Sequence, residues 1–296
     1  MAGIVVGVDG SPSSRQAMAW AASEAEVRGT DLVVMQSWHE PIVEGPGAAA
    51  CYEIDAVVDD AKHDLDAMAS MAHHAHPTVD VACALVSGRP AQALVSRAED
   101  ADLLVVGSRG SGGFLGLDLG SISTKVARRS TVPVIVVRGE HDCAGRDEVI
   151  VGVDGSACSR HALRWAADWA NVHGKVLVAV MAWNFLEPQG PDGPQGIRAD
   201  YAPSDAEAAL DAIVTEVLGP WNDHLITKEA VNELPARAIL ERASNACLLV
   251  VGRHGTARWA PPEFGATALQ VLHHAACPVA VIPEPAQVPE PVPDRT

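Results

Sequence analysis

The sequence is short of positive charge. It carries 21 lysine and arginine residues against 38 aspartate and glutamate residues, which gives a formal net charge of -17 at pH 7. Nucleic acids and anionic membrane surfaces select basic faces, so this balance argues against both as partners. It still permits a small anion in a local pocket, where backbone dipoles and one or two cations suffice.

Other absences narrow the class further. No apolar run reaches the length of a membrane-spanning helix, and residues 1–3 lead straight into an apolar run without the pattern of a signal peptide. None of the six cysteines belongs to a CxxC pair, which is typical of buried or incidental thiols in a reducing compartment. We therefore expect a cytoplasmic protein.

Two common nucleotide-binding motifs are also missing. There is no GxxxxGK[ST] segment, which argues against a P-loop ATPase. The first apolar run is followed by VDGSPSS rather than GxGxxG, so an acidic side chain stands where a dinucleotide pyrophosphate would approach. Because no general base is evident either, slow ATP hydrolysis is the most that we expect of the chain as an enzyme.

The most informative pattern is an internal duplication. The segment VVGVDGS at 5–11 returns as IVGVDGS at 150–156, and the same offset of 145 residues relates Trp20 to Trp165 and Pro133 to Pro278. A repeat of this length is a whole domain rather than a solenoid unit. We predict one domain at residues 1–140, a second at 147–285, and a proline-rich tail at 286–296.

Within each copy, apolar runs alternate with segments of helical periodicity. In the first copy the runs GIVVGV, DLVVMQS, VDVACALV, DLLVVG and VPVIVVR are typical of parallel strands that are buried on both faces. Helix-like segments lie between them, at about 13–28, 54–76, 91–99 and 121–130. Right-handed crossovers then predict an α/β fold, with an open five-stranded parallel sheet covered by helices on both faces in each domain.

Two loops fall beyond the carboxyl ends of these strands, where such sheets bind ligands. After the first strand, Asp9 could bind a ribose hydroxyl or a divalent cation that bridges phosphates. Alternatively, Asp9 and Ser11 only form a turn and cap the next helix. The second loop, GSRGSGGFLGLDLGS at 107–121, has glycines that let backbone N–H groups approach an anion. Its Ser121 is expected to cap the following helix and to offer a hydroxyl to a phosphate.

Together these residues resemble the universal stress protein family, in its tandem type with two domains in one polypeptide. The resemblance rests on V-G-V-D-G-S at the start of each copy, G-x2-G-x9-G near each end, and the closing runs PVIVV and PVAVI. It implies strand order 3-2-1-4-5 in each domain, with the two last strands paired in an intrachain pseudo-dimer. It also implies ATP binding, which this motif accompanies in many members.

The resemblance further implies which residues meet the nucleotide. Asp9 would contact the ribose and, through the phosphates, a Mg²⁺ ion, and the backbone of Ser37 would contact adenine. The other implied contacts are Val8, Val106, Gly107, Gly110, Gly120, Ser121 and Ile122 in the first copy, and Asp154, Ala182, Gly252, Gly255 and Gly265 in the second.

The second copy departs from the pattern at its phosphate end. Ser121 becomes Ala266, the loop SGGFLGLDL becomes TARWAPPEF, and the cations Lys125, Arg128 and Arg129 become Gln270, His273 and His274. A lost hydrogen bond to a charged group costs about 1.5–3 kcal/mol, roughly a tenfold to hundredfold loss of affinity. We predict a strong first site and a weaker or empty second site, unless Arg253, His254 or Arg258 supplies the missing charge.

The sequence thus predicts an ATP-binding regulatory protein of the stress response. Three alternatives stay open: a slow Mg²⁺-dependent ATPase, a nucleotide-independent module that binds a partner, and a cyclic nucleotide in place of ATP. Whether tandem chains associate further into a homodimer is also left open.

Overall fold

The computed structural model describes residues 3–38, 54–110, 119–139, 145–183, 203–219, 226–255 and 264–284. The first half contains β1 (Ile4–Gly7), α1 (Pro12–Arg28), β2 (Leu32–Trp38), α2 (Ile54–Ala75), β3 (Val81–Ser87), α3 (Pro90–Arg97), β4 (Leu103–Gly107), α4 (Ser121–Arg129) and β5 (Val134–Val137). The second half repeats this order with β6 (Glu148–Gly152), α5 (Ala157–Val172), β7 (Val176–Ala182), α6 (Pro203–Leu218), β8 (Ile226–Val231), α7 (Pro235–Arg242), β9 (Leu248–Gly252), α8 (Ala266–His274) and β10 (Val279–Ile282).

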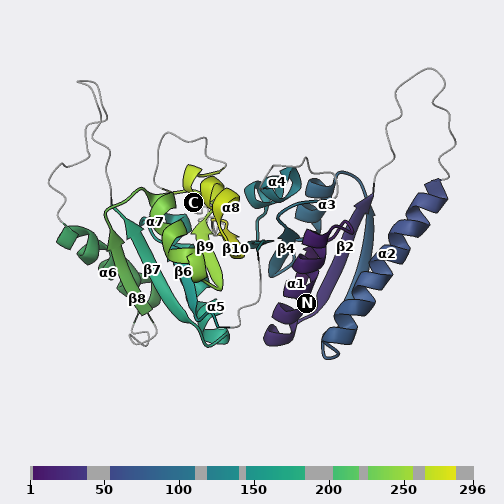
Figure 1. The fold of residues 1–296 in the computed structure, drawn as a ribbon, viewed down its shortest axis with the longest axis horizontal. Coiled ribbons are helices and arrows are strands. Elements are labelled where there is room, and N and C mark those ends of the chain that lie inside the picture. Colours follow the sequence, from purple (N-terminus) through teal and green to yellow (C-terminus); the bar gives the residue numbers. More distant parts are fainter. Residues whose placement is uncertain are drawn as a thin grey trace, which may run out of the picture.

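All ten strands form one sheet, in the order β3-β2-β1-β4-β5-β10-β9-β6-β7-β8 (Figure 1). Each half has the predicted order 3-2-1-4-5 with parallel neighbours. The halves meet where β5 pairs antiparallel with β10, with Ile135 opposite Ala280. The predicted fold and the predicted joint between the last strands are therefore confirmed.

Helices cover both faces of the sheet, because alternate residues of each strand point to opposite sides. Ile4 and Val6 belong to the hydrophobic core beneath α1, α2, α5 and α6, whereas Val5 packs into the core beneath α3, α4, α7 and α8. These three side chains are almost completely buried. Burying one such side chain stabilises the fold by about 1.5–3 kcal/mol, which explains why the central strands are continuous apolar runs. Every described helix is too short or too polar to cross a lipid bilayer.

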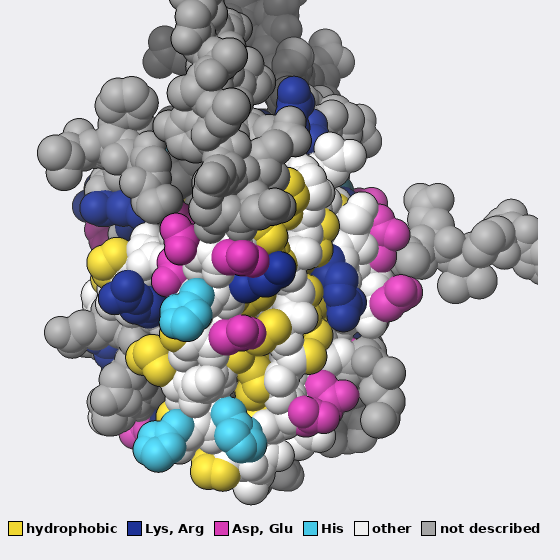
Figure 2. Space-filling model, turned by 90° about the vertical axis from the view of Figure 1, so that its right-hand side faces the viewer, with side chains coloured by type: hydrophobic (Ala, Val, Ile, Leu, Met, Phe, Trp, Pro, Cys, Tyr) yellow, Lys and Arg dark blue, Asp and Glu magenta, His cyan; other side chains and the backbone are white. Residues whose placement is uncertain are grey.

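The prediction of strands buried on both faces is wrong for β3. This strand lies at the edge of the sheet, where Ala82 and Cys83 are exposed and its other residues are at most half-buried. Figure 2 looks onto this side of the molecule and shows a band of hydrophobic side chains flanked by charged and histidine side chains. The opposite edge strand, β8, carries Lys228 and Glu229 instead, the kind of charge that protects an edge from pairing.

Side chains reinforce the joint between the halves. The guanidinium of Arg253, in the loop after β9, donates to the carbonyl of Ser130 at 2.9 Å, just beyond the end of α4. In the other direction, Arg138 donates to the carbonyl of Leu272 in α8. These bonds attach the ends of α4 and α8 to the opposite half.

A buried polar network also crosses the joint. Glu24 of α1, 3% exposed, accepts hydrogen bonds from Trp169 Nε1 on α5 at 2.9 Å and from Nε2 of His173, the C-cap of α5, at 3.0 Å. Arg28 donates to the same carboxylate at 2.5 Å. Burial raises the pKa of Glu24, but the His173 hydrogen bond and the Arg28 charge together outweigh it and hold the pKa below the ordinary value. The carboxylate is therefore ionised at neutral pH, and it needs all of these donors to remain buried.

Candidate nucleotide site

Asp9 and Ser11 shape the turn that leaves β1. The backbone N–H of Ser11 donates to Asp9 Oδ1 at 3.1 Å, and Ser11 Oγ accepts from the backbone N–H of Ser14 at 3.1 Å, which caps α1. The turn and the cap that the sequence allowed are thus both formed. They fix the Asp9 carboxylate at the carboxyl end of β1, in the centre of the first half-sheet.

The loop after β4 is fastened to this turn. Ser11 Oγ donates to the carbonyl of Arg109 at 3.4 Å, and the backbone N–H of Arg109 donates to Ser13 Oγ at 3.2 Å. The ends of two neighbouring parallel strands therefore form one connected surface. The chain builds the sheet in one direction from β1 to β3 and in the other direction from β4 to β5, so the order of strands changes direction between β1 and β4. Open α/β sheets usually bind their ligands at such a point.

Gly110 lies directly against Asp9. A Cβ atom at this position would stand 2.6 Å from Asp9 Oδ2, closer than real contacts allow. At Gly107 an added Cβ would stand 2.8 Å from the backbone carbon and oxygen of Ser13. The two glycines thus let the loop backbone approach a carboxylate and a helix start, as a site for a polyhydroxylated or phosphorylated ligand requires.

The same loop leads to α4. The backbone N–H of Gly120 donates to the carbonyl of Ser108 at 2.7 Å, and the hydroxyl of Ser123 donates to that carbonyl at 3.2 Å. The prediction that Ser121 caps the helix is wrong by one residue. Gly120, with its extended backbone, is the N-cap, and Ser121 is the first helical residue with an exposed side chain. Since Gly120 has no side chain to cap the helix, the first turn of α4 differs from that of α1, which Ser11 caps.

The remaining predicted residues lie at the same edge of the sheet. Val8 donates its backbone N–H to the carbonyl of Met35 at 2.8 Å, and both Val8 and Val106 have buried side chains. Ser37, next to the end of β2, and Ile122, in the first turn of α4, are half-buried. The structure therefore brings Asp9, Gly107, Gly110 and Gly120 into one loop cluster, with Ser37 at the end of the adjacent strand.

The second half repeats this construction. Asp154 Oδ1 accepts the backbone N–H of Ser156 at 3.0 Å, and an added Cβ at Gly255 would stand 2.2 Å from Asp154 Oδ2. Gly252 packs against the start of α5, and Gly265 is the N-cap of α8. Ala182, the counterpart of Ser37, is the last residue of β7, and Ser37 is the last residue but one of β2.

The duplicated architecture agrees with a comparison against known families. The sequence model of the universal stress protein family matches this chain twice, over residues 2–138 and 145–283. The chain belongs to the universal stress protein family. The resemblance that the sequence motifs indicated is thereby confirmed, in its tandem form.

Individual relatives extend over the whole molecule. Universal stress protein Rv1996 of Mycobacterium tuberculosis is 32% identical over 315 residues and covers 97% of each chain. Universal stress protein Rv2623 of the same species is 30% identical, with 95% of this chain and 96% of the relative covered. Among solved structures, a universal stress protein from Archaeoglobus fulgidus matches 96% of this chain and 97% of its own with a TM-score of 0.71. That structure is 20% identical and supports the fold alone.

The cations assigned to phosphate in this universal stress protein are placed differently from the prediction. Arg128 and Arg129 lie in the last turn of α4, about 10 Å along the helix from Ser121, and Arg128 stands over the ring of Phe264. In the second half, Arg253 donates across the joint to Ser130. Both guanidinium groups thus make contacts that cross the joint between the halves. Residues 111–118 and 256–263, which include Arg258, lie outside the described residues.

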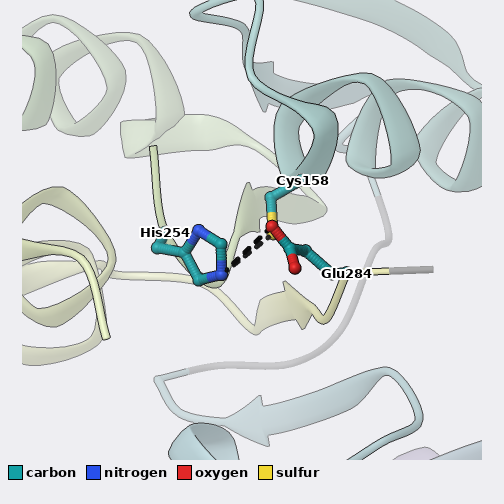
Figure 3. Close-up of side chains that lie close together, drawn as sticks. All are labelled: Cys158, His254 and Glu284. Carbon is teal, nitrogen blue, oxygen red and sulfur yellow. Dashed lines mark hydrogen bonds and ion pairs between the residues drawn. The ribbon is translucent and has the colours of Figure 1, made fainter. Parts of the chain in front are cut away.

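A cluster that sequence reasoning missed lies beside the second loop. Cys158 Sγ stands 3.7 Å from His254 Nε2, and this nitrogen is 3.5 Å from Glu284 Oε1 (Figure 3). Burial raises the pKa of the Cys158 thiol above its usual range. The offset relates Cys158 to Ser13 and His254 to Arg109, and the backbone N–H of Arg109 donates to Ser13 Oγ in the first half, so the two positions are neighbours in both halves. Only the fold shows this, because the sequence alone does not connect the two positions.

Replacing Gly107 by alanine in this universal stress protein is expected to lower the free energy of unfolding by about 1–3 kcal/mol. The new Cβ would meet backbone atoms of Ser13, which cannot move aside as a side chain can. Urea unfolding followed by circular dichroism measures the change. The matched control is Gly110→Ala, whose Cβ meets only the Asp9 side chain, so its stability loss should be clearly smaller. Equal losses in the two variants would contradict the distinction.

Proposed function

We propose that this universal stress protein binds ATP as a regulatory ligand in the cytoplasm, with a tight site in its first half and a weak or empty site in its second. The two halves, residues 1–140 and 147–285, would each contribute one loop cluster. The observation that carries the proposal is the fit of Gly110 against the Asp9 carboxylate at the ends of two neighbouring strands. A side chain at position 110 would collide with this carboxylate, so only glycine lets the loop pass so close to it.

The chemistry of this cluster suits an adenine nucleotide. A carboxylate at the end of β1 accepts hydrogen bonds from ribose hydroxyls, whereas glycine backbone N–H groups and the start of α4 favour phosphate. The half-buried Ser37, at the end of the neighbouring strand, provides backbone groups for a base. Asp9 is also suited to a Mg²⁺ ion carried by the phosphates, since that ion prefers one or two carboxylates together with phosphate oxygens.

The inequality of the two sites follows from one hydroxyl. Ser121, at the start of α4, is exposed and stands where Ala266 begins α8. Its loss alone corresponds to about a tenfold to hundredfold weaker phosphate contact. Two of the three residues that could compensate have other contacts, since Arg253 is bonded to the first half and His254 lies within the Cys158 cluster, whereas Arg258 lies outside the described residues.

The experiment that tests the proposal identifies the nucleotide directly. Freshly purified full-length protein is denatured, and the released small molecules are identified and quantified by mass spectrometry. Nucleotide-free protein is then titrated with ATP and Mg²⁺, and separately with cyclic AMP. About one tightly bound ATP per chain is expected. Tighter binding of cyclic AMP than of ATP would show that the cyclic nucleotide is the ligand. Binding of neither nucleotide would support the alternative of a nucleotide-independent module that binds a partner.

Replacing Asp9 by alanine should weaken ATP binding by about tenfold to hundredfold, because a hydrogen bond to a charged group is lost. Isothermal titration measures the change, and Asp154→Ala is the matched variant in the second half. If the first site is the tight one, Asp154→Ala leaves its affinity nearly unchanged. Steady phosphate release from ATP that disappears in Asp9→Ala would instead identify a slow ATPase.

A further inference from the structure

We propose that Cys158, His254 and Glu284 bind a zinc-type divalent metal ion in the second half of the molecule. Among the described residues, these three side chains form a group whose possible ligand atoms all lie within 4.8 Å of one another. Thiolate sulfur, imidazole nitrogen and carboxylate oxygen are the three protein ligands that Zn²⁺ uses. The site does not depend on the proposed nucleotide function.

Two of the three separations between the ligand atoms match those of a tetrahedral site, and the third is within 4.8 Å. With usual Zn–S and Zn–N bond lengths, a sulfur and a nitrogen on one tetrahedral ion lie about 3.6 Å apart, and a nitrogen and an oxygen about 3.4 Å apart. The observed distances are 3.7 Å for Cys158 Sγ to His254 Nε2 and 3.5 Å for His254 Nε2 to Glu284 Oε1. Shifts of a few tenths of an ångström would complete the coordination.

The arrangement is not that of a cysteine nucleophile with its base. In a catalytic triad the carboxylate bonds one imidazole nitrogen and the nucleophile bonds the other. Here both Cys158 and Glu284 approach the same nitrogen, Nε2, so the three ligand atoms converge on one point (Figure 3). The thiol is also fully buried, which closes it to a substrate but not to an ion.

Three separate segments supply the ligands. Cys158 is in the first turn of α5, His254 lies in the loop after β9, and Glu284 follows β10. His161 Nδ1–H donates to the carbonyl of Pro283 at 2.9 Å and so holds the chain beside Glu284. Because the side chains of His254 and Glu284 are 24% and 43% exposed, the ion would have an entry path and room for water as the fourth ligand.

The charge balance also favours a divalent ion. Ionised Cys158 and Glu284 together neutralise its two positive charges, and the nearby Arg253 guanidinium is bonded to Ser130 on the far side of the joint. On binding, the Cys158 S–H proton passes to solvent and the sulfur donates its electron pair to the metal. The first half lacks the site, since the offset places Ser13, Arg109 and Gly139 at the three equivalent positions.

The test uses full-length protein made without a histidine tag. Zinc is quantified in protein purified from Zn²⁺-supplemented medium, and metal-free protein is titrated with Co²⁺, whose absorption shows a thiolate-to-cobalt charge-transfer band. We expect about one zinc per chain and the band in wild type and in the control Cys83→Ser, which removes an exposed thiol. Cys158→Ser introduces the residue that the first half has at the equivalent position, Ser13, and this variant should lose the band. Zn²⁺ binding should weaken by more than about a hundredfold, because even residues that only hydrogen-bond to metal ligands contribute about tenfold to hundredfold to metal affinity.

A second variant distinguishes a loss of metal binding from a loss of folding. Glu284→Gln changes a side chain that is 43% exposed, so it should leave the unfolding midpoint of metal-free protein unchanged while weakening Zn²⁺ binding. Wild-type protein that takes up no Zn²⁺ and gives no cobalt band would overturn the proposal. A band that persists in Cys158→Ser would also overturn it, because another thiol would then be the ligand.

Discussion

Gly110→Glu is expected to abolish tight nucleotide binding, with an affinity loss of more than about a hundredfold, while the protein stays folded. The first added atom, Cβ, would stand 2.6 Å from Asp9 Oδ2, so the carboxylate must leave its place at the end of β1. The new negative charge would then lie where phosphate and ribose are proposed to bind. A glutamate carboxylate and a phosphate carry charges of the same sign and repel each other, so we expect both shape and charge to oppose binding.

The measurement is titration of nucleotide-free protein with ATP and Mg²⁺, with urea unfolding as the check on folding. Ser70→Glu is the matched control, because it adds the same charge at an exposed position of α2 in the same half. Gly255→Glu makes the equivalent change beside Asp154 and tests whether the second half contributes to binding. Undiminished ATP affinity in Gly110→Glu would remove the site from this loop.

The second large effect is expected at the joint between the halves. Glu24→Gln should lower the free energy of unfolding by about 1.5–3 kcal/mol, the range for hydrogen bonds to a charged group. Its carboxylate is 3% exposed and accepts from Trp169, His173 and Arg28, and an amide cannot accept from all of them. Glu26→Gln, two residues along α1, is the control. That carboxylate is 44% exposed and pairs with His76 near the surface, where ion pairs contribute little.

A double-mutant cycle separates this network from a general effect on α1. Trp169→Phe removes the indole N–H together with part of the buried ring, and the cycle separates the lost hydrogen bond from the lost packing. Its coupling with Glu24→Gln should be clear because the two groups are 2.9 Å apart. Strictly additive losses would show that the bond across the joint contributes nothing. Glu26→Gln and Trp169→Phe, which share no contact, should be additive.

The Glu24 contribution should also depend on pH. Its pKa in the folded protein lies below the ordinary value of 4.5, so the folded state binds fewer protons than the unfolded state as this group titrates. The stability difference between wild type and Glu24→Gln is therefore complete above pH 4.5 and shrinks as the pH falls through the folded pKa. A difference that grew on acidification would contradict the direction of this shift.

Much of the architecture could be predicted because its signals are local or repeated. Continuous β-branched runs, helical periodicity and the offset of 145 residues predict the elements and their duplication, and the family motifs predict the strand order. The glycine loop was visible for the same reason, since Gly107 ends an apolar run and Gly110 lies three residues beyond it. The helix cap was misplaced by one residue because glycine and serine both suit an N-cap, and pattern alone cannot choose between Gly120 and Ser121.

The features that escaped prediction depend on residues far apart in the chain. β3 is exposed because it lies at the edge of the sheet. An apolar run in the sequence does not show whether its strand will lie at the edge or in the centre. Cys158 and His254 are 96 positions apart, and Glu24 and His173 are 149 apart. No periodicity connects such pairs, so they become visible only when the tertiary fold brings them into contact.

The network at Glu24 bears on how the chain recognises its own other half. The offset that relates the halves places Trp169 at the position of Glu24 and His173 at that of Arg28. In a symmetric homodimer a residue near the two-fold axis lies beside the same residue of the partner. A dimer of two first halves would therefore bury Glu24 beside a second Glu24. In the tandem chain the two halves differ in sequence, so Glu24 of the first half can accept hydrogen bonds from Trp169 and His173 of the second. The two sides of the joint therefore differ in chemistry, which favours pairing of a first half with a second half and disfavours pairing of two first halves from neighbouring chains.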